Sequence, residues 1–289
     1  AITTAELHTC GLRTDATITC WGRNAAGQTD APSGTFTAIT TAELHTCGLR
    51  TDATITCWGR NAAGQTDAPS GTFTAITTAE LHTCGLRTDA TITCWGRNAA
   101  GQTDAPSGTF TAITTAELHT CGLRTDATIA CWGSNVYGQT DAPPGTFTAV
   151  TAREHYSCGL RTDATIACWG WNANDRADAP PGTFTAIVAG AWHSCGLRTN
   201  SSITCWGRNY DDQTDAPPGT FTAITTGGHH SCGLRTDATI TCWGRNDEGQ
   251  TDEPPGTFTA VTSGAGRSCG LRNDATIICW GYYAPIRIS

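Results

Sequence analysis

Cys10-Gly-Leu-Arg-Thr-Asp-Ala-Thr-Ile-Thr-Cys20-Trp-Gly22 occurs eight times along the chain, almost letter for letter. The copies recur every 37 residues, so repetition rather than length defines the organisation of this 289-residue chain. The units run over 1–37, 38–74, 75–111, 112–148, 149–185, 186–222 and 223–259, with a shortened eighth at 260–289. So short a unit has too little core to fold alone, and the units are expected to stack into one domain, 1–289.

Apolar residues within one unit alternate with a period of two, which is typical of β-strands and leaves no helical stripe. The turn residues between them predict four short strands per unit, at 36–41, 8–13, 17–22 and 27–31. Four antiparallel strands repeated around an axis indicate an all-β fold, a β-propeller of eight four-stranded blades. A seven-bladed ring with one partial unit is the alternative. Ring closure has to bring Ala1 beside the eighth unit, where 284–289 are expected to supply an outer strand.

The two cysteines of each unit are expected to face each other. A hairpin centred on Asp15 places Cys10 opposite Cys20. The same register places Leu12 opposite Ile18, so it satisfies a disulfide and an apolar pair together. One disulfide per blade is therefore predicted, in the pairs Cys10 and Cys20, Cys47 and Cys57, Cys84 and Cys94, Cys121 and Cys131, Cys158 and Cys168, Cys195 and Cys205, Cys232 and Cys242, and Cys269 and Cys279.

The other face of this hairpin carries Trp21 opposite Thr9, so both faces are expected to be buried against neighbouring repeats. The weak point of the register is the turn Thr14-Asp15-Ala16. Alanine stands there at a position where three-residue hairpin turns prefer glycine.

Composition excludes several classes of function. Sixteen cysteines indicate an oxidising compartment, secreted or periplasmic, and the C-x9-C spacing does not match a zinc site, so no metal is expected. The net charge is −8 and all 17 basic residues are arginines without a basic stripe, which argues against nucleic-acid binding. The absence of lysine excludes Schiff-base chemistry and a Walker phosphate loop. No apolar run approaches the roughly 20 residues of a membrane span, and no cofactor is expected.

Three motifs resemble the repeat of the regulator-of-chromosome-condensation superfamily: His-Thr-Cys-Gly-Leu-Arg, Cys-Trp-Gly-Arg-Asn and Gly-Gln-Thr-Asp-Ala-Pro. The resemblance covers the whole chain and implies a propeller that binds another protein through one face. The short period and paired cysteines are similar to secreted bacterial members such as the propeller-type β-lactamase inhibitor protein, and to the crinkly repeats of plant receptor kinases. The nuclear exchange-factor type is disfavoured because it works in a reducing compartment.

Differences between the repeats point to one face of the ring. Units one to three are identical, and unit four first departs at Ala130. Later changes fall mainly in the segments equivalent to 5–7 and 23–26, which an up-and-down blade places at the same end. The turns at the opposite end hardly change. One face therefore varies, although exposed loops also vary without selection.

The candidates for a binding site on this face are mainly aromatic, a class that carries much of the binding energy at protein interfaces. They are Tyr137, His155, Tyr156, Trp171, Trp192, Tyr210, Asp211, His229 and Tyr282, joined by Tyr283 and by the charged residues Asp175, Arg176, Asp212, Asp247, Glu248 and Arg267. The aromatics do not recur at one position of the repeat. A lectin usually repeats one pocket per blade, so this scatter favours a protein partner over a glycan.

Residues able to do chemistry recur instead of forming one distinctive set. His8 and its equivalents are expected to be structural and to satisfy backbone carbonyls, and Glu6 and its equivalents lack a partner for general acid–base catalysis. The sequence thus predicts a non-enzymatic, secreted binding scaffold that recognises a protein through blades four to eight, with inhibition of that protein as one form of the function. The alternatives are a carbohydrate-binding propeller, and a repeat-amplified or engineered propeller without a specific partner.

Overall fold

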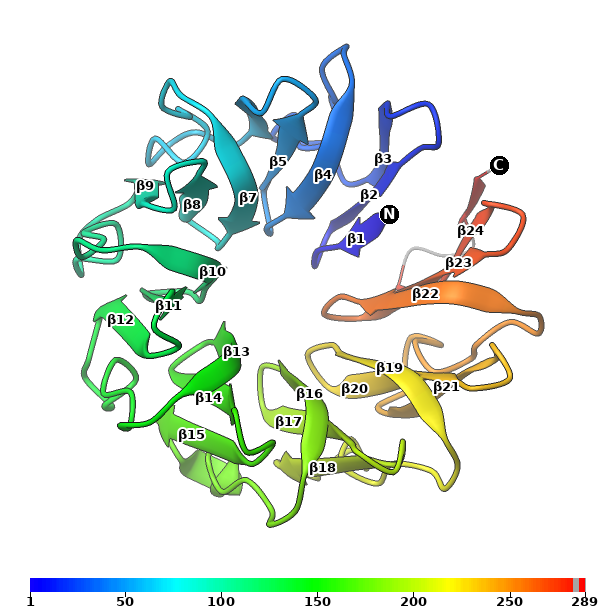
Figure 1. The fold of residues 1–289 in the computed structure, drawn as a ribbon. Coiled ribbons are helices and arrows are strands. Elements are labelled where there is room, and N and C mark those ends of the chain that lie inside the picture. The colour runs from blue at the N-terminus through cyan, green and yellow to red at the C-terminus, as the bar shows by residue number, and fades with distance from the viewer. Residues whose placement is uncertain (283–285, 289) are drawn as a thin grey trace.

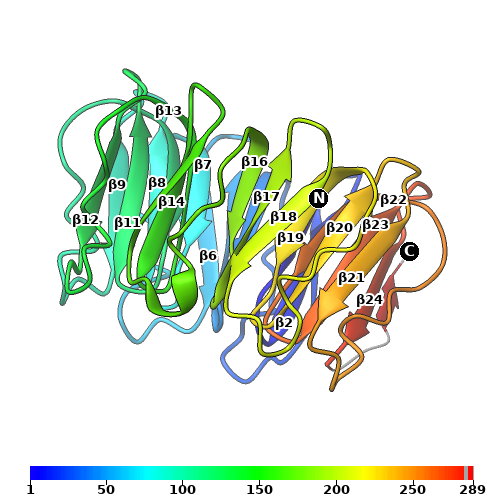
Figure 2. The same ribbon diagram turned by 90° about the horizontal axis from the view of Figure 1, so that it is seen from below.

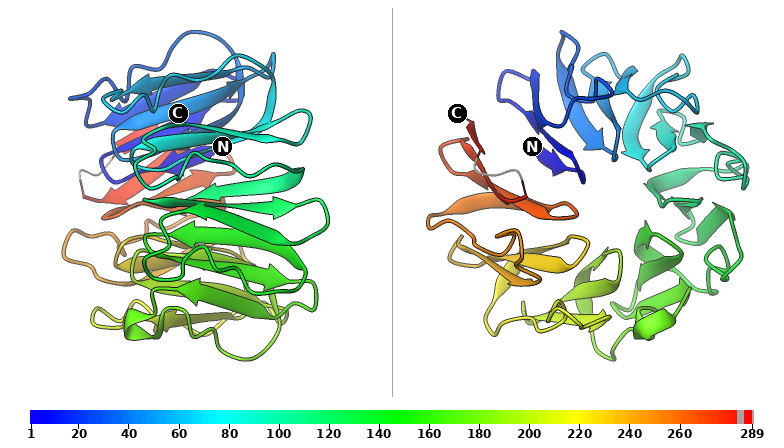
Figure 3. Two further views of the ribbon diagram at one scale, coloured as in Figure 1. Left: turned by 90° about the vertical axis from the view of Figure 1, so that its left-hand side faces the viewer. Right: turned by 180° about the vertical axis from the view of Figure 1, so that it is seen from behind.

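Eight small antiparallel sheets follow one another around a ring in the computed structural model, which describes residues 1–282 and 286–288 (Figure 1). Seen from the side, the blades stand next to each other and their turns gather at the two ends of the ring (Figure 2). The N-terminal strand lies beside blade eight, so the first and last repeats meet and close the ring (Figure 3). The prediction of a propeller with eight blades is confirmed, and the seven-bladed alternative is wrong.

Each blade runs outward from the centre of the ring in chain order. The inner strands are β1 (Ile2–Thr4), β4 (Phe36–Thr41), β7 (Phe73–Thr78), β10 (Phe110–Thr115), β13 (Phe147–Arg153), β16 (Phe184–Ala189), β19 (Phe221–Thr226) and β22 (Phe258–Ser263). The middle strands are β2 (His8–Leu12), β5 (His45–Arg50), β8 (His82–Arg87), β11 (His119–Arg124), β14 (Tyr156–Arg161), β17 (His193–Arg198), β20 (His230–Arg235) and β23 (Arg267–Arg272). The outer strands are β3 (Ile18–Gly22), β6 (Ile55–Gly59), β9 (Ile92–Gly96), β12 (Ile129–Gly133), β15 (Ile166–Gly170), β18 (Ile203–Gly207), β21 (Ile240–Gly244) and β24 (Ile277–Gly281).

Seven blades have three strands, so the prediction of a fourth strand at 27–31 and its equivalents is wrong. Side chains in this segment bond the local backbone and leave it as a series of turns. Asn24 Oδ1 accepts the Thr29 N–H at 2.9 Å, and Gln28 Oε1 accepts the Ala26 N–H at 2.9 Å. Such local bonds compete with the hydrogen bonds of a sheet.

Blade eight alone has a fourth strand. β25 (Ile286–Ile288) pairs antiparallel with β24, which confirms an outer strand within the expected range 284–289. The rest of that range lies outside the described residues. A single 3-10 turn, η1 (Ala173–Asp175), follows β15 in blade five.

The predicted hairpin register is confirmed in every blade. In blade one Cys10 pairs with Cys20 and Leu12 with Ile18. All eight predicted disulfides are present, which indicates an oxidising environment. Ala16 does take the conformation that favours glycine, with φ 65°.

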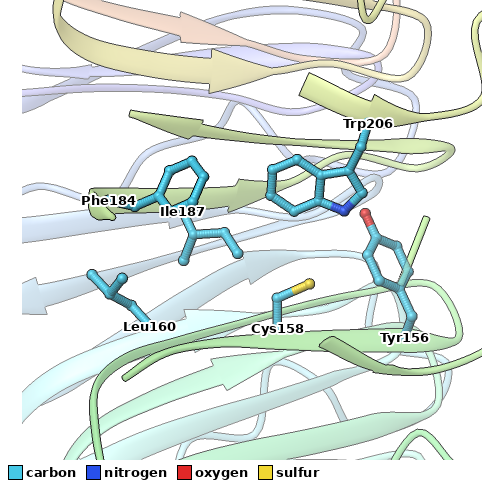
Figure 4. Packing of buried hydrophobic residues seen from close by; sticks show 6 residues of the cluster. All are labelled: Tyr156, Cys158, Leu160, Phe184, Ile187 and Trp206. Carbon is cyan, nitrogen blue, oxygen red and sulfur yellow. The ribbon is translucent and has the colours of Figure 1, made fainter. Parts of the chain in front are cut away.

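Blades pack by placing the cystine face of one against the aromatic face of the next, as predicted. Figure 4 shows this contact between blades five and six, formed by Tyr156, Cys158, Leu160, Phe184, Ile187 and Trp206. The ring centroids of Phe184 and Trp206 lie 6.5 Å apart, and both side chains are buried. Each blade therefore completes its core only through its neighbour.

A polar bond also joins each blade to the next. His45 Nε2 lies 2.9 Å from Thr83 Oγ1, and equivalent bonds to Thr or Ser start from His8, His82, His119, His193 and His230. The partner of Nε2 is a hydroxyl of the next blade, and the expected bond to the backbone acts on His8 and His119, through Glu43 and Glu154. Burial lowers the pKa of His45 to about 3, with the neighbouring His8 and His82 adding to the effect, so the imidazole is neutral.

Candidate binding site on the variable face

Two segments of each blade lie side by side at one end of the ring: the turn between the inner and middle strands, and the segment after the outer strand. A backbone hydrogen bond joins them in all eight blades. In blade one the Arg23 N–H donates to Leu7 O at 2.9 Å, and in blade five the Trp171 N–H donates to His155 O at 2.9 Å. The segments that vary most between repeats therefore form one surface, which we call the variable face.

Five aromatic side chains form a continuous row across the variable face from blade four to blade seven. Tyr137 stacks on Trp171 with ring centroids 5.4 Å apart, and His155 lies 5.2 Å from Tyr137 and 5.7 Å from Trp171. Trp171 meets Trp192 edge-on at 6.3 Å, and Trp192 lies 6.4 Å from His229. These separations fall within the range of about 4.5–7 Å that favours aromatic pairs. We call these five residues the aromatic ladder.

Two arginines, Arg176 and Arg208, contact aromatic rings of the ladder. The Arg176 guanidinium carbon lies 4.4 Å from the Trp171 ring centroid and 4.9 Å from that of Trp192. The Arg208 guanidinium carbon lies 5.4 Å from Trp192 and 4.7 Å from the ring of Tyr210. Cation–π contacts of this kind contribute about 0.5–2 kcal/mol each, and the contact between Arg176 and Trp192 joins blade five to blade six.

Arg176 is fully buried, which the sequence did not predict for a residue of the binding face. It occupies the position of the buried Gln28 in blade one, and its Nε and Nη1 donate to Ala173 O at 2.9 Å and Ala191 O at 3.2 Å. Burial lowers the pKa of Arg176 below its usual value. Its guanidinium therefore packs against Trp171 and Trp192 and is not part of the exposed surface.

The outer end of the site is more exposed and more acidic. Tyr210 is 76 % exposed, and its hydroxyl lies 3.4 Å from Asn174 Oδ1 of the preceding blade. Asp211 Oδ2 lies 3.1 Å from His229 Nδ1, so the end of the ladder is tied to a carboxylate. Tyr210 and Asp211 thus extend the row outward.

Backbone conformations that L-residues seldom adopt gather beside the ladder. Outside the repeated hairpin turns, the described non-glycine residues with positive φ are Glu154, Asn174, Asp175 and Asp212, at 47°, 61°, 58° and 56°. Asp175 and Asp212 stand where blade one has Gly27. Each such residue costs about 1 kcal/mol or more, and strain of this kind is often found at binding sites.

Tyr156 does not belong to the variable face, so its prediction as a contact residue is wrong. It is fully buried, and its hydroxyl contacts Gly190 O at 2.9 Å, His193 O at 3.0 Å and Ser194 Oγ at 2.9 Å. Burial raises its pKa to about 12. The tyrosine stands where other repeats have histidine and makes the same bond to the next blade.

The other residues predicted for the binding face are spread around the ring. Arg267 also replaces the repeated histidine; it is only 2 % exposed, and its Nη1 lies 3.4 Å from Thr9 Oγ1 across the closing seam. Asp247 is exposed and pairs with Arg245 at 2.7 Å. Tyr282 is 40 % exposed on blade eight, one blade beyond the end of the ladder, and Tyr283 lies outside the described residues.

An arc of carboxylates from blades one to five lies near the centre of the same end. Glu6, Glu43, Glu80, Glu117 and Glu154 line a cavity of about 240 Å³. Burial, together with the neighbouring carboxylates Glu6 and Glu80, raises the pKa of Glu43 above its usual value. The variable face therefore combines an acidic centre with an aromatic arc.

Residues 1–282 and 286–288 contain no group of histidine, cysteine, aspartate or glutamate side chains arranged to hold a metal ion. Within the same residues, no helix has the length and apolar character needed to cross a membrane.

Solved structures share this ring. The ectodomain of the receptor kinase CR4 from Physcomitrella patens is 28 % identical with a TM-score of 0.68, and the match covers 86 % of this chain and 74 % of that one. The CRINKLY ectodomain of the receptor kinase ACR4 from Arabidopsis thaliana is 25 % identical with a TM-score of 0.66, over 88 % of this chain and all of that one. Prp20p from Saccharomyces cerevisiae, described with its binding to Gsp1p and histones, is 13 % identical with a TM-score of 0.65, over 88 % and 83 %. That last likeness shows the fold alone.

No curated protein sequence matches the chain. The family model described as the regulator of chromosome condensation (RCC1) repeat matches six segments, which together cover more than half of the chain: 6–28, 43–65, 80–102, 117–139, 184–213 and 221–250. The chain therefore belongs to the regulator of chromosome condensation (RCC1) repeat family.

Proposed function

We propose that the chain is a non-enzymatic binding protein of a secreted or periplasmic setting, which holds a protein partner on the aromatic ladder and the adjoining Tyr210 and Asp211. The observation that carries this proposal is the continuity of the ladder across four blades. Its members come from three different positions of the repeat, and blade one has Leu7, Arg23 and Ala26 at those positions. An apolar, aromatic surface is thus built only where the repeats diverge.

The exposed side chains of this surface suit a protein interface. Val136, Tyr137 and Tyr210 are 79 %, 47 % and 76 % exposed, although large apolar side chains elsewhere in the ring are mostly buried. Tyrosine, tryptophan and arginine are the residues that most often act as energetic anchors of interfaces. The contacts among the rings fix their rotamers before binding, which lowers the entropy that a partner has to overcome.

A glycan fits the geometry less well than a protein. Sugars stack on a free aromatic face, but Trp171 is covered by Tyr137 on one side and contacted by Arg176. The site also joins unlike blades and does not repeat a pocket in each. Both features favour a broad partner surface.

Unselected drift is also a poor account of the site. Random changes in separate loops do not favour aromatic side chains that contact one another from blade to blade. Tyr137, Trp171, Trp192 and His229 do so across four blades. This continuity supports a selected surface.

The acidic residues of the variable face indicate what kind of protein surface would fit it. The carboxylate arc of blades one to five lies at the same end as the ladder, as do Asp211 and Asp212, on a chain with net charge −8. A partner surface with an apolar centre and arginine or lysine at its margin complements this pattern. The plant neighbours are receptor ectodomains and Prp20p is described with protein partners, which agrees with binding as the function. Inhibition would follow if the partner were an enzyme whose active site the ring covers.

Replacement of Trp171 by alanine is expected to weaken partner binding by roughly 30-fold or more, because loss of an interface anchor costs about 2 kcal/mol or more. Tyr210→Ala, on a largely exposed side chain, is expected to act in the same direction without disturbing the fold. The measurement is recovery of the partner from extracellular or periplasmic extract, followed by titration with the purified partner.

The matched control is Arg60→Ala. Arg60 stands in the unvaried blade two at the repeat position that Trp171 occupies in blade five. It is expected to bind as the native chain does. Equal loss in Arg60→Ala and Trp171→Ala would place the interface elsewhere. Binding on a glycan array that disappears with Trp171→Ala, with no protein recovered, would replace the protein partner by a sugar.

A further inference from the structure

The hairpin turn of blade six differs chemically from the other seven. At its tip the chain reads Asn200-Ser201-Ser202, where blade one has Asp15-Ala16-Thr17. All other repeats have aspartate at the first of these positions, namely Asp15, Asp52, Asp89, Asp126, Asp163, Asp237 and Asp274. Blade six therefore carries an amide where the rest of the ring carries carboxylates.

Asn200 keeps the hydrogen bonds of the aspartates that it replaces. Asp15 Oδ1 accepts the Thr17 N–H at 3.0 Å and the Thr17 hydroxyl at 2.6 Å. In the same way, Asn200 Oδ1 accepts the Ser202 N–H at 3.1 Å and the Ser202 hydroxyl at 2.8 Å. Ser201 has φ 66°, and the alanines of the other turns have φ 65–68°. The turn of blade six thus has the same conformation as the other seven.

The difference that remains is the amide nitrogen of Asn200. Both bonds of the side chain use Oδ1, and within residues 1–282 and 286–288 no atom accepts a hydrogen bond from Nδ2. The residue is exposed at the tip of the turn. Asparagine followed two positions later by serine or threonine, without proline between them, is the acceptor pattern for N-linked glycans. No other asparagine of the chain stands in this pattern.

The surroundings of the turn suit such a modification. The disulfide between Cys195 and Cys205 closes a loop with a sequence separation of 10, and Asn200 lies at its midpoint. Disulfides form in the endoplasmic reticulum lumen, which is also where secreted eukaryotic proteins receive N-linked glycans. The cysteines and the asparagine of this hairpin therefore indicate the same compartment.

The turn also lies away from the variable face. Strand β17 (His193–Arg198) separates Trp192, a member of the aromatic ladder, from the turn that contains Asn200 (Figure 2). Six residues of a strand span about 20 Å. A glycan on Asn200 would occupy the hairpin end of blade six and leave the ladder free.

We propose that Asn200 is an N-glycosylation site, which receives its glycan in a eukaryotic secretory pathway from an oligosaccharide carried on a polyprenyl diphosphate. A bond forms between Asn200 Nδ2 and the anomeric carbon of the first sugar, and the bond from that carbon to the diphosphate oxygen breaks. The diphosphate leaves with the electron pair, and the amide nitrogen gives one proton to a base of the transferase. The inference rests on the secreted setting of the proposed function and is independent of the protein partner.

The test is synthesis of the full chain, behind a cleavable signal sequence, with microsomes that contain the transferase. One increase in mass that peptide N-glycosidase removes is expected. Asn200→Asp restores the residue of the other seven turns, so it is expected to keep the native circular dichroism spectrum and to lose the whole increase. Ser202→Ala is expected to lose it too, because the hydroxyl belongs to the acceptor pattern. No increase in the native chain, or one that survives in Asn200→Asp, overturns the proposal.

A matched variant adds a second site. Asp237→Asn gives the turn of blade seven the same pattern, since Thr239 already donates to residue 237 from its N–H at 2.9 Å and from its hydroxyl at 2.7 Å. This chain is expected to show twice the mass increase, and a single increase contradicts the argument from the turn.

Partner recovery with the native and Asn200→Asp chains keeps the two proposals apart. Both chains are expected to recover the partner equally. A glycan without a recovered partner would count against the protein interface alone, and a recovered partner without a glycan would count against the site at Asn200 alone.

Discussion

Lowering the pH from 7 to 4.5 is expected to destabilise the ring by more than any single substitution, because six histidines are buried at its seams without a charged partner. Burial lowers their pKa values to about 4 for His8, His82 and His230, and to about 3 for His45, His119 and His193. In the unfolded chain the same groups titrate near 6.5.

The direction of the pH effect on stability follows from which state, folded or unfolded, binds more protons. Between pH 6.5 and about 4 the unfolded chain takes up protons that the folded ring does not, so the free energy of unfolding falls as the pH falls. Each histidine contributes about 1.4 kcal/mol per pH unit well below 6.5, and six contribute roughly 8 kcal/mol per unit. The stability that depends on these six neutral histidines is fully present above pH 6.5. The raised pKa values of Glu43, Glu154 and Glu253 act in the opposite direction, but three partly buried carboxylates do not offset six buried imidazoles.

The measurement is guanidinium unfolding of the disulfide-bonded protein at several pH values, followed by tryptophan fluorescence. His193→Tyr supplies a matched variant, since Tyr156 makes the equivalent bonds one blade earlier, to Gly190 O and Ser194 Oγ. Blade seven offers Gly227 and Ser231 at those positions. The variant is expected to unfold with a pH slope smaller by about 1.4 kcal/mol per unit. An unchanged slope would show that His193 does not titrate with unfolding.

The frame of each blade could be predicted from the sequence because several local requirements agree on it. The C-x9-C spacing, the pair Leu12 and Ile18 and the turn at Asp15 allow only one register, and the structure has that register. Asp15 Oδ1 accepts the Thr17 N–H at 3.0 Å, which helps Ala16 to stay in its unfavourable conformation. Local chemistry thus compensates for the missing glycine.

The fourth strand was predicted wrongly because alternation alone does not distinguish a strand from a chain of turns. Asn24 decides the outcome, since its amide bonds the Thr29 N–H and Asp30 Oδ1, at 2.9 Å and 2.7 Å. A segment that satisfies its own backbone in this way gains little from pairing with β3. The Asn-x-x-Gly-Gln pattern carries that signal, which hydrophobic spacing misses.

The membership of the binding site could be predicted only in part. Tyr156 and Arg176 look like surface residues by type, but their repeat positions are those of the buried His8 and Gln28. A comparison of the repeats by position rather than by residue type places Tyr156 with His8 and Arg176 with Gln28, which predicts that both are buried. The contacts between Trp171 and Trp192 depend on the spacing of neighbouring blades, which no local pattern contains.

Reduction of all eight disulfides is expected to unfold the ring at neutral pH. Each bond closes a short loop, with a sequence separation of 10, and contributes about 2–3 kcal/mol in the chain-entropy model. Eight such contributions sum to roughly 20 kcal/mol, more than the 5–15 kcal/mol by which most domains are stable. The first cysteine of every pair is fully buried, so reduction under native conditions is expected to be slow and to speed up in guanidinium.

The readout is circular dichroism together with the number of alkylated cysteines by mass spectrometry. The variant Cys84→Ser with Cys94→Ser removes one bond from an interior blade and is expected to stay folded, with unfolding free energy lower by about 2–3 kcal/mol. The comparison separates the contribution of one bond from the requirement for all of them. A protein with sixteen alkylated cysteines and a native spectrum would mean that inter-blade packing alone holds the ring, and the argument for an oxidising compartment would then fail.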